Sequence, residues 1–172
     1  GFEWSAPWRY KRLWEVLGED DRHSLQDSLD LQRDYHSVLT RKMRTLLPGL
    51  GNLNIRKLLT DWDGKHAADS SAAAFWNLWY SRHLLPALGK QLSGEYVKAQ
   101  DAPLDSMTVL ALLDTVPGKE LAKESLADAW VETSALLGPD PNKWQWGMLH
   151  QIKFVHPLHG LAADQLQNSM TL

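Results

Sequence analysis

Cysteine is absent from this sequence of 172 residues. Disulfide bonds, thiolate nucleophiles and zinc–thiolate sites are therefore excluded. No run of apolar residues approaches the roughly 18 that a membrane-spanning helix requires, so we expect no membrane partner. Residues Gly1 to Trp4 show no basic stretch followed by an apolar one. We therefore expect Gly1 to be a processed or cleaved end and not the start of a signal peptide.

A strong charge of either sign is also missing. The chain has 18 basic and 21 acidic residues, which give a formal net charge of −3. A protein whose surface binds the phosphate backbone of nucleic acids normally carries an excess of basic residues. The tightest basic group, Arg41, Lys42 and Arg44, falls within one expected helix, and we interpret it as a solvated helix face. We expect no nucleic-acid partner.

The glycine patterns of known catalytic and phosphate-binding sites do not occur. The sequence has neither a Gly-x-Ser-x-Gly motif nor a phosphate-binding glycine loop. His150, His156 and His159 lie close together, but without the i, i+4 spacing and the Glu of a metalloprotease helix. We interpret them as groups that orient a turn and expect no metal site in this chain. A Ser–His–Asp triad built from distant positions stays open.

Tryptophan is abundant, with nine in the chain. Each one buries a large apolar area and has one N–H group to satisfy, so packing is the first interpretation. Trp4, Trp8 and Trp14 are clustered, which leaves an aromatic substrate groove as the alternative for these three.

Turn signals divide the chain into helices of ordinary length. Ser24 and Asp27 resemble a capping box, and Pro48-Gly49 is a strong stop signal. Asn52 and either Asp69 or Ser70 are expected caps, and Asp63-Gly64 is an expected turn. Pro86 should kink or end its helix. The apolar spacing predicts helices over residues 8–17, 25–47, 53–62, 71–86, 104–113 and 119–137, with a loop over residues 93–103.

The sequence therefore predicts a mostly α protein. We expect one irregular multi-helix domain of about five or six helices over residues 1–172, because no fixed-period repeat is present. Ile152, Phe154 and Val155 allow one short β-strand near the C-terminus. Residues 160–172 have weak periodicity, and we expect a mobile tail there.

Four short blocks follow one another along nearly the whole sequence. They are Gly1-Phe2-Glu3-Trp4 with Arg9, Arg12 and Leu13; Leu31-Gln32-Arg33-Asp34 with Ser37; Leu58-Leu59-x-x-Trp62-Asp63-Gly64 with Asp69 and Ser70; and Trp144-x-Trp146-Gly147-x-x-His150 with Phe154-x-His156-Pro157-Leu158. Together they resemble the penicillin acylase (penicillin amidase) family of N-terminal-nucleophile hydrolases, in an internal segment of the large (beta) chain. The resemblance implies a helical part of an α+β protein.

The resemblance also implies a reaction that this chain does not complete alone. Family members are cut from one precursor, and the new N-terminal residue of the large chain, usually Ser, is the nucleophile, with its own α-amino group as the base. Residue 1 here is Gly, which has no hydroxyl. We therefore expect a fragment of the large chain that is inactive alone. No cofactor is expected in this chain, although calcium is expected in a full-length family member.

Arg9 is the one candidate catalytic residue, with Arg12 as its neighbour. By position Arg9 matches an arginine that the family has near its oxyanion-stabilising Asn, so the resemblance implies an auxiliary, electrostatic role. A surface helix arginine is the other interpretation. No substrate-binding residue is identified from the sequence.

The sequence leaves two hypotheses for the function of this chain. The first is a fragment of an amide hydrolase that removes an acyl group from a β-lactam, an acyl-homoserine lactone or a related amide. Its partners would be the small chain, the rest of the large chain and the substrate, and the fragment would tend to self-associate. The resemblance implies a periplasmic or secreted enzyme. The alternative is a non-catalytic helical binding or scaffold module.

Overall fold

The computed structural model describes residues 6–18, 22–93 and 104–151. Several predictions fall outside these ranges: the strand at Ile152, Phe154 and Val155, the tail over residues 160–172, most of the loop over residues 93–103, and the histidines at positions 156 and 159. Within the described ranges there is no strand, only one antiparallel bridge between His36 and Lys65. The prediction of a mostly α protein is confirmed.

Helices follow one another along the described chain. In order they are α1 (Trp8–Leu17), α2 (Leu25–Gln32), α3 (Val38–Leu46), α4 (Leu53–Thr60), α5 (Ser71–Leu78), a π-helical segment (Trp79–Leu84), α6 (Leu85–Ser93), α7 (Ser106–Leu113), α8 (Val116–Leu137), a 3₁₀ turn (Pro141–Lys143) and α9 (Trp146–Leu149).

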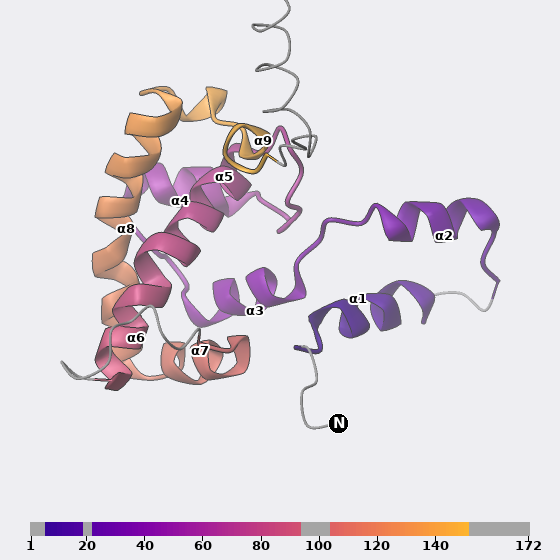
Figure 1. Ribbon diagram of the computed structural model, residues 1–172, viewed down its shortest axis with the longest axis horizontal. Helices are drawn as coiled ribbons and strands as arrows, with labels where there is room; N and C mark the ends of the chain where they lie inside the picture. Colours follow the sequence, from indigo (N-terminus) through magenta and orange to yellow (C-terminus); the bar gives the residue numbers. More distant parts are fainter. Residues whose placement is uncertain (1–5, 19–21, 94–103, 152–172) are drawn as a thin grey trace, which may run out of the picture.

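The centre of the molecule is the continuous rod formed by α5, the π-helical segment and α6. Figure 1 shows α8 running beside this rod on one side, while α1 and α2 lie on the opposite side, beyond α3. Phe75, Trp76 and Trp79 on the rod are buried, and Trp144 from the end of the described chain packs among the same core residues. The alanines at the start of α5 are buried too, and small side chains let neighbouring elements approach closely.

Local side-chain caps explain where most of the helices begin. Ser24 and Asp27 form a reciprocal capping box at the start of α2. Asn52, Ser70 and Asp105 accept hydrogen bonds from the first backbone N–H groups of α4, α5 and α7. Such bonds satisfy donors that have no partner within the helix. The caps predicted at Ser24 and Asn52 are confirmed, and of the two candidates Asp69 and Ser70 it is Ser70 that caps α5.

The single long helix predicted over residues 25–47 is wrong, because the chain breaks between α2 and α3. The Asp34 carboxylate accepts a hydrogen bond from the backbone N–H of His36 at 2.8 Å, which turns the chain. Ser37 then caps α3 by accepting a hydrogen bond from the Thr40 N–H. The apolar side chains of the two halves also have different surroundings. Leu25 and Leu29 in the first half are exposed to solvent, whereas Met43 in the second half is buried in the core.

Pro86 does not end its helix. One turn earlier the hydrogen bonding changes register, so that the Leu85 N–H donates to the Tyr80 carbonyl five residues back. The wider π-helical turn changes which carbonyls the backbone N–H groups bond just before Pro86, a residue that has no backbone N–H of its own. Similarly, α8 starts at Val116 and not at Lys119. Pro117 is tolerated in the first turn because the N–H groups there have no helical partner anyway.

Candidate functional site

Arg9 and Arg12 on α1 hold the C-terminal end of α2. The Arg9 guanidinium donates to the Leu31 carbonyl at 2.6 Å and, with a longer bond of 3.4 Å, to the Asp34 carbonyl. The Arg12 Nε donates to the Asp34 carboxylate at 2.7 Å. Carbonyls at a helix C-terminus lack helical partners and carry partial negative charge, so a guanidinium is well placed there.

Asp34 is the centre of a polar network. One carboxylate oxygen accepts from Arg12, and the other accepts from the backbone N–H of His36 and contacts the His36 Nδ1 at 2.7 Å. Burial would raise the pKa of Asp34, but the hydrogen bonds from His36 and the positive charge of Arg12 together lower it to about 2. Asp34 is therefore a carboxylate at any ordinary pH.

His36 connects this network to the turn after α4. Its Nε2 lies 3.2 Å from the Asp63 carboxylate. The neighbouring Ser37 N–H donates to the Gly64 carbonyl at 3.0 Å, next to the bridge between His36 and Lys65. Gly64 has a φ of +83°, which an L side chain rarely adopts. The Asp63-Gly64 turn predicted from the sequence is therefore what places Asp63 beside His36.

Helix α9 closes the other side of the same region. The Gly147 N–H donates to the Ala68 carbonyl at 2.7 Å, and the Ser71 hydroxyl donates to the Trp144 carbonyl at 2.8 Å. A Cβ at position 147 would lie 3.1 Å from that of Ala68, so the close approach favours glycine. The rings of Trp146 and His150 stack nearly parallel, with centroids 4.9 Å apart.

A cleft of about 540 Å³ lies where these segments meet. Residues of the first, second and fourth sequence blocks line it, and the third block contributes His66 and Ala68 from the stretch between Gly64 and Asp69. The full lining is Trp8, Arg9, Arg12, Asp34, Tyr35, His36, Ser37, Val38, His66, Ala68, Trp146, Gly147 and His150. We call it the four-block cleft. Segments up to about 140 positions apart in the sequence are thus brought to one place, and the volume is within the usual range for small-molecule sites.

His66 lines the cleft as a neutral imidazole. The Asn77 side-chain nitrogen donates to the Ala73 carbonyl at 2.8 Å, which fixes the orientation of the amide, and it also lies 2.8 Å from the His66 Nδ1. His66 must then accept at Nδ1 and donate from Nε2 to the Thr40 hydroxyl, 3.0 Å away. Burial lowers the pKa of His66, in agreement with this arrangement.

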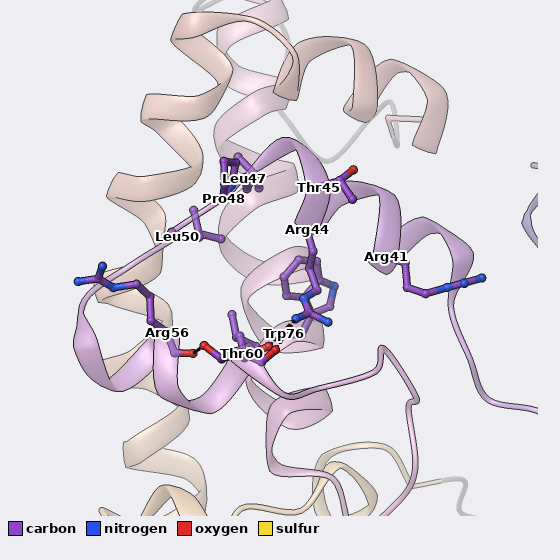
Figure 2. A pocket seen from close by; sticks show the side chains of 11 residues that line it. Arg41, Arg44, Thr45, Leu47, Pro48, Leu50, Arg56, Thr60 and Trp76 are labelled. Atoms are coloured by element: carbon purple, nitrogen blue, oxygen red, sulfur yellow. Dashed lines mark hydrogen bonds between the residues drawn. The ribbon is translucent and has the colours of Figure 1, made fainter.

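A second groove of about 420 Å³ lies between α3 and α4. Figure 2 shows Arg44 at its centre beside Trp76 and Thr60, while Arg41 and Arg56 point away from it in opposite directions. The Arg44 guanidinium donates to the Leu59, Thr60 and Trp62 carbonyls at the end of α4. Arg41 pairs with Glu15 of α1. Arg44 and Arg41 therefore join helices, and the three arginines do not converge on a common ligand position.

The structure places the residues singled out in the sequence as follows. Arg9 lines the four-block cleft, and its catalytic role stays a prediction. His150 lines the cleft as well. Trp62 packs between His66 and Trp76 and donates from its indole N–H to the Lys65 carbonyl, a structural role. Within residues 6–18, 22–93 and 104–151 no group of three His, Asp or Glu could hold a metal ion, and none of the helices there is long and apolar enough to cross a membrane.

Sequence reasoning missed His36, His66 and Tyr35 as cleft residues. The Asp34-x-His36 spacing directly before Ser37, a residue type that often caps helices, was a usable signal for a turn. The prediction of one long helix over residues 25–47 left this signal unused. His66 gave no local signal, because its partners Thr40 and Asn77 are 26 and 11 residues away.

Replacing Asp34 by Asn is expected to lower the free energy of unfolding at pH 7 by about 2 kcal/mol, since the ionised form is the one that Arg12 and His36 stabilise. The folded-state pKa is below the unfolded value, so this stability is present above pH 4 and is lost as the pH falls toward 2. Urea unfolding of the wild-type chain and of D34N, measured at several pH values from 7 down to 2, gives this contribution to stability as a function of pH. The exposed aspartate Asp61 provides the matched control, D61N, and equal losses in the two variants would contradict the network.

Two comparisons with known proteins complete the description of the site. A family model described as penicillin amidase matches residues 1–170 of the chain. A comparison with curated proteins gives no match.

Proposed function

This chain belongs to the penicillin amidase family, and we propose that it is part of a hydrolase that removes the acyl group from an N-acylated β-lactam, an acyl-homoserine lactone or a related amide. The observation that carries this proposal is that the stretches spanned by the four sequence blocks converge on one cleft. Blocks that are distant in the sequence but adjacent in space are typical of a site and not of isolated turns.

In this proposal the nucleophile comes from another part of the enzyme. The role of this chain is to build the helical wall beside the reacting groups. Such an enzyme would be periplasmic or secreted and would have calcium elsewhere in the whole protein.

Arg9 is the residue through which this wall would act on the reaction. Its guanidinium is fixed on the carbonyl end of α2 and lines the four-block cleft. A positive charge held in place supports developing negative charge without having to reorient first. We assign Arg9 an auxiliary electrostatic role.

The proposed partner is the rest of the acylase. Helix α1 buries none of its residues, and Tyr10, Trp14 and Leu17 recur on it at a spacing that places them on one exposed face. Exposed apolar groups at helical spacing are typical of a surface that another polypeptide covers. Without that cover the chain would be expected to self-associate.

The proposed function is tested with the protein that contains this segment and with the 172-residue chain alone. We expect the whole protein to hydrolyse an N-acyl amide and the isolated chain to show no turnover. In the whole protein, R9A should reduce kcat/KM by about tenfold or more. Release of free amine is the measurement. Turnover by the pure chain would contradict the missing-nucleophile argument, and an inactive whole protein would favour a helical binding module.

A further inference from the structure

Basic residues gather in one stretch of a chain whose net charge is negative. Between Asp34 and Asp61 the sequence has five Lys or Arg residues and no Asp or Glu, although the whole chain has a formal net charge of −3. The groove of about 420 Å³ between α3 and α4, which we call the α3–α4 groove, is lined by three of these basic residues and by no acidic one. The five lie on the two helices: Arg41, Lys42, Arg44, Arg56 and Lys57.

Most of this charge has no carboxylate partner. Arg41 pairs with Glu15, but among the described residues no ion pair forms at Arg44 or at the exposed Arg56. Arg44 is fixed in the groove by its bond to the Leu59 carbonyl at 2.6 Å. Figure 2 shows Arg41 and Arg56 pointing in opposite directions on either side of Arg44. Guanidinium groups arranged in this way cannot share one small anion, but they suit a longer acidic partner that lies along the groove.

The floor of the α3–α4 groove is apolar. Leu47, Leu50, Leu59 and Trp76 line it and belong to the hydrophobic core. An apolar floor with a basic rim is complementary to a helix that exposes both apolar and acidic side chains. A nucleic acid fits less well, because Trp76 is only 2% exposed and offers no free ring face on which a base could stack.

Helix α2 of the same chain is a helix of this kind. It carries Asp27 and Asp30 and no basic residue, and Leu31 is the one residue that it buries. Leu25 and Leu29 are four positions apart and therefore share one face of the helix, where they are 79% and 38% exposed. Asp30 is exposed directly beside Leu29 in the sequence. Among the described residues, nothing covers the apolar face of this acidic helix.

Helix α2 cannot enter the groove of its own chain. Figure 1 shows it projecting away from α4, on the far side of α3. The link from α2 to α3 is only residues 33–37, and Asp34 fixes this link through its bonds to Arg12 and to the His36 N–H. A second copy of the chain can bring its α2 to the groove without breaking these bonds.

We propose that this chain self-associates by placing α2 of one copy in the α3–α4 groove of another, with Leu25 and Leu29 over the apolar floor and Asp30 beside Arg56. In a symmetric dimer each copy gives its α2 to the other, so the contact forms twice. The two surfaces have opposite charge, and salt therefore weakens the association. The pairing uses neither the four-block cleft nor amide hydrolysis and is independent of the proposed function.

Self-association is measured by sedimentation velocity on the 172-residue chain over a range of concentrations, at low and at high salt. We expect the dissociation constant to rise about tenfold or more at high salt. The exposed face of α1 is the competing contact, and because it is apolar, association through it would not weaken with salt. Association that persists at high salt and is lost in W14A would therefore overturn the inference.

Charge reversal identifies the two surfaces. D30K on α2 and R56E at the groove should each weaken self-association about tenfold or more. An equal mixture of the two variants should associate again, because the reversed charges on the two copies complement each other.

The matched controls are D128K and K123E, which reverse exposed charges on α8 and should leave self-association unchanged. Equal losses in these controls, or no recovery in the mixture of D30K and R56E, would overturn the inference. A wild-type chain that stays monomeric at low salt would overturn it as well, even if one of the variants failed to fold.

Discussion

Replacing Trp144 by Ala is expected to lower the free energy of unfolding by about 3–5 kcal/mol. The side chain is 0% exposed. Its ring centroid lies 4.8 Å from that of Trp130 and 6.4 Å from that of Phe75. The indole N–H donates to the Gly138 carbonyl at 2.7 Å. The substitution therefore leaves a large cavity between α5 and α8 and a carbonyl without its donor.

The loss should reach the four-block cleft as well as the core. Trp144 precedes α9, and its own carbonyl accepts the hydrogen bond from Ser71 at the start of α5. Without this anchor, Trp146, Gly147 and His150 lose their fixed position beside Ala68. We therefore expect the NMR signals of the Trp8 and Trp146 indoles to shift in W144A under conditions where most of the chain is still folded.

Two other tryptophan variants show whether burial is the cause. Trp14 is 63% exposed, so W14A should cost less than about 1 kcal/mol. W144F keeps most of the buried area and loses the hydrogen bond to Gly138, so it should cost about 1–2 kcal/mol. Urea unfolding followed by circular dichroism measures all three. Similar costs for W144A and W14A would mean that Trp144 does not anchor α9 to the core.

The second large effect is expected at Gly118, in the first turn of α8. A Cβ built there would lie 2.0 Å from the Leu112 carbonyl oxygen and 2.6 Å from its carbon. Both atoms are backbone at the end of α7, so they cannot move aside as a flexible side chain could. In an open helix, alanine in place of glycine would stabilise the fold by about 1 kcal/mol. Here we expect G118A to destabilise it by about 3 kcal/mol.

Gly138, at the other end of α8, provides a matched comparison. It has a φ of +94° with no atom within 4 Å of a built Cβ, so G138A tests backbone strain alone. We expect it to cost about 1 kcal/mol. Thermal and urea unfolding of both variants give the order of the two costs. A stabilising G118A would show that α7 and α8 do not approach each other as closely as described.

Local features of the fold were predictable because they depend on neighbouring residues. Ser24, Asn52 and Ser70 cap their helices through bonds to N–H groups two or three positions away, and such bonds are readable from the sequence. The turn at Asp63-Gly64 and the end of α8 at Gly138 were predicted for the same reason. The chain length and the apolar spacing were enough to indicate a mostly helical protein.

The errors arose where tertiary contacts outweighed local pattern. The apolar spacing from Leu25 to Leu46 is compatible with one helix, but Arg9 and Arg12 stabilise the end of α2 and Asp34 turns the chain toward Ser37. Pro86 normally stops a helix, but the burial of Trp79 and Leu84 on both sides of the turn holds the chain in a π-helical register. Burial of large side chains outweighs the propensity of a single residue.

By itself, the sequence determined the helical class of this protein, the caps of several of its helices and the exclusion of cysteine chemistry. It also contained the four blocks of the penicillin amidase family. Only the tertiary structure decided that the stretches spanned by these blocks form one cleft, that Arg9 lines it with no carboxylate partner among the described residues, and that His66 is neutral there. The physical reason is separation along the sequence. Caps join residues two or three positions apart, whereas the Trp8–Ser106 hydrogen bond joins residues 98 positions apart. Contacts of that kind exist only once the core has packed.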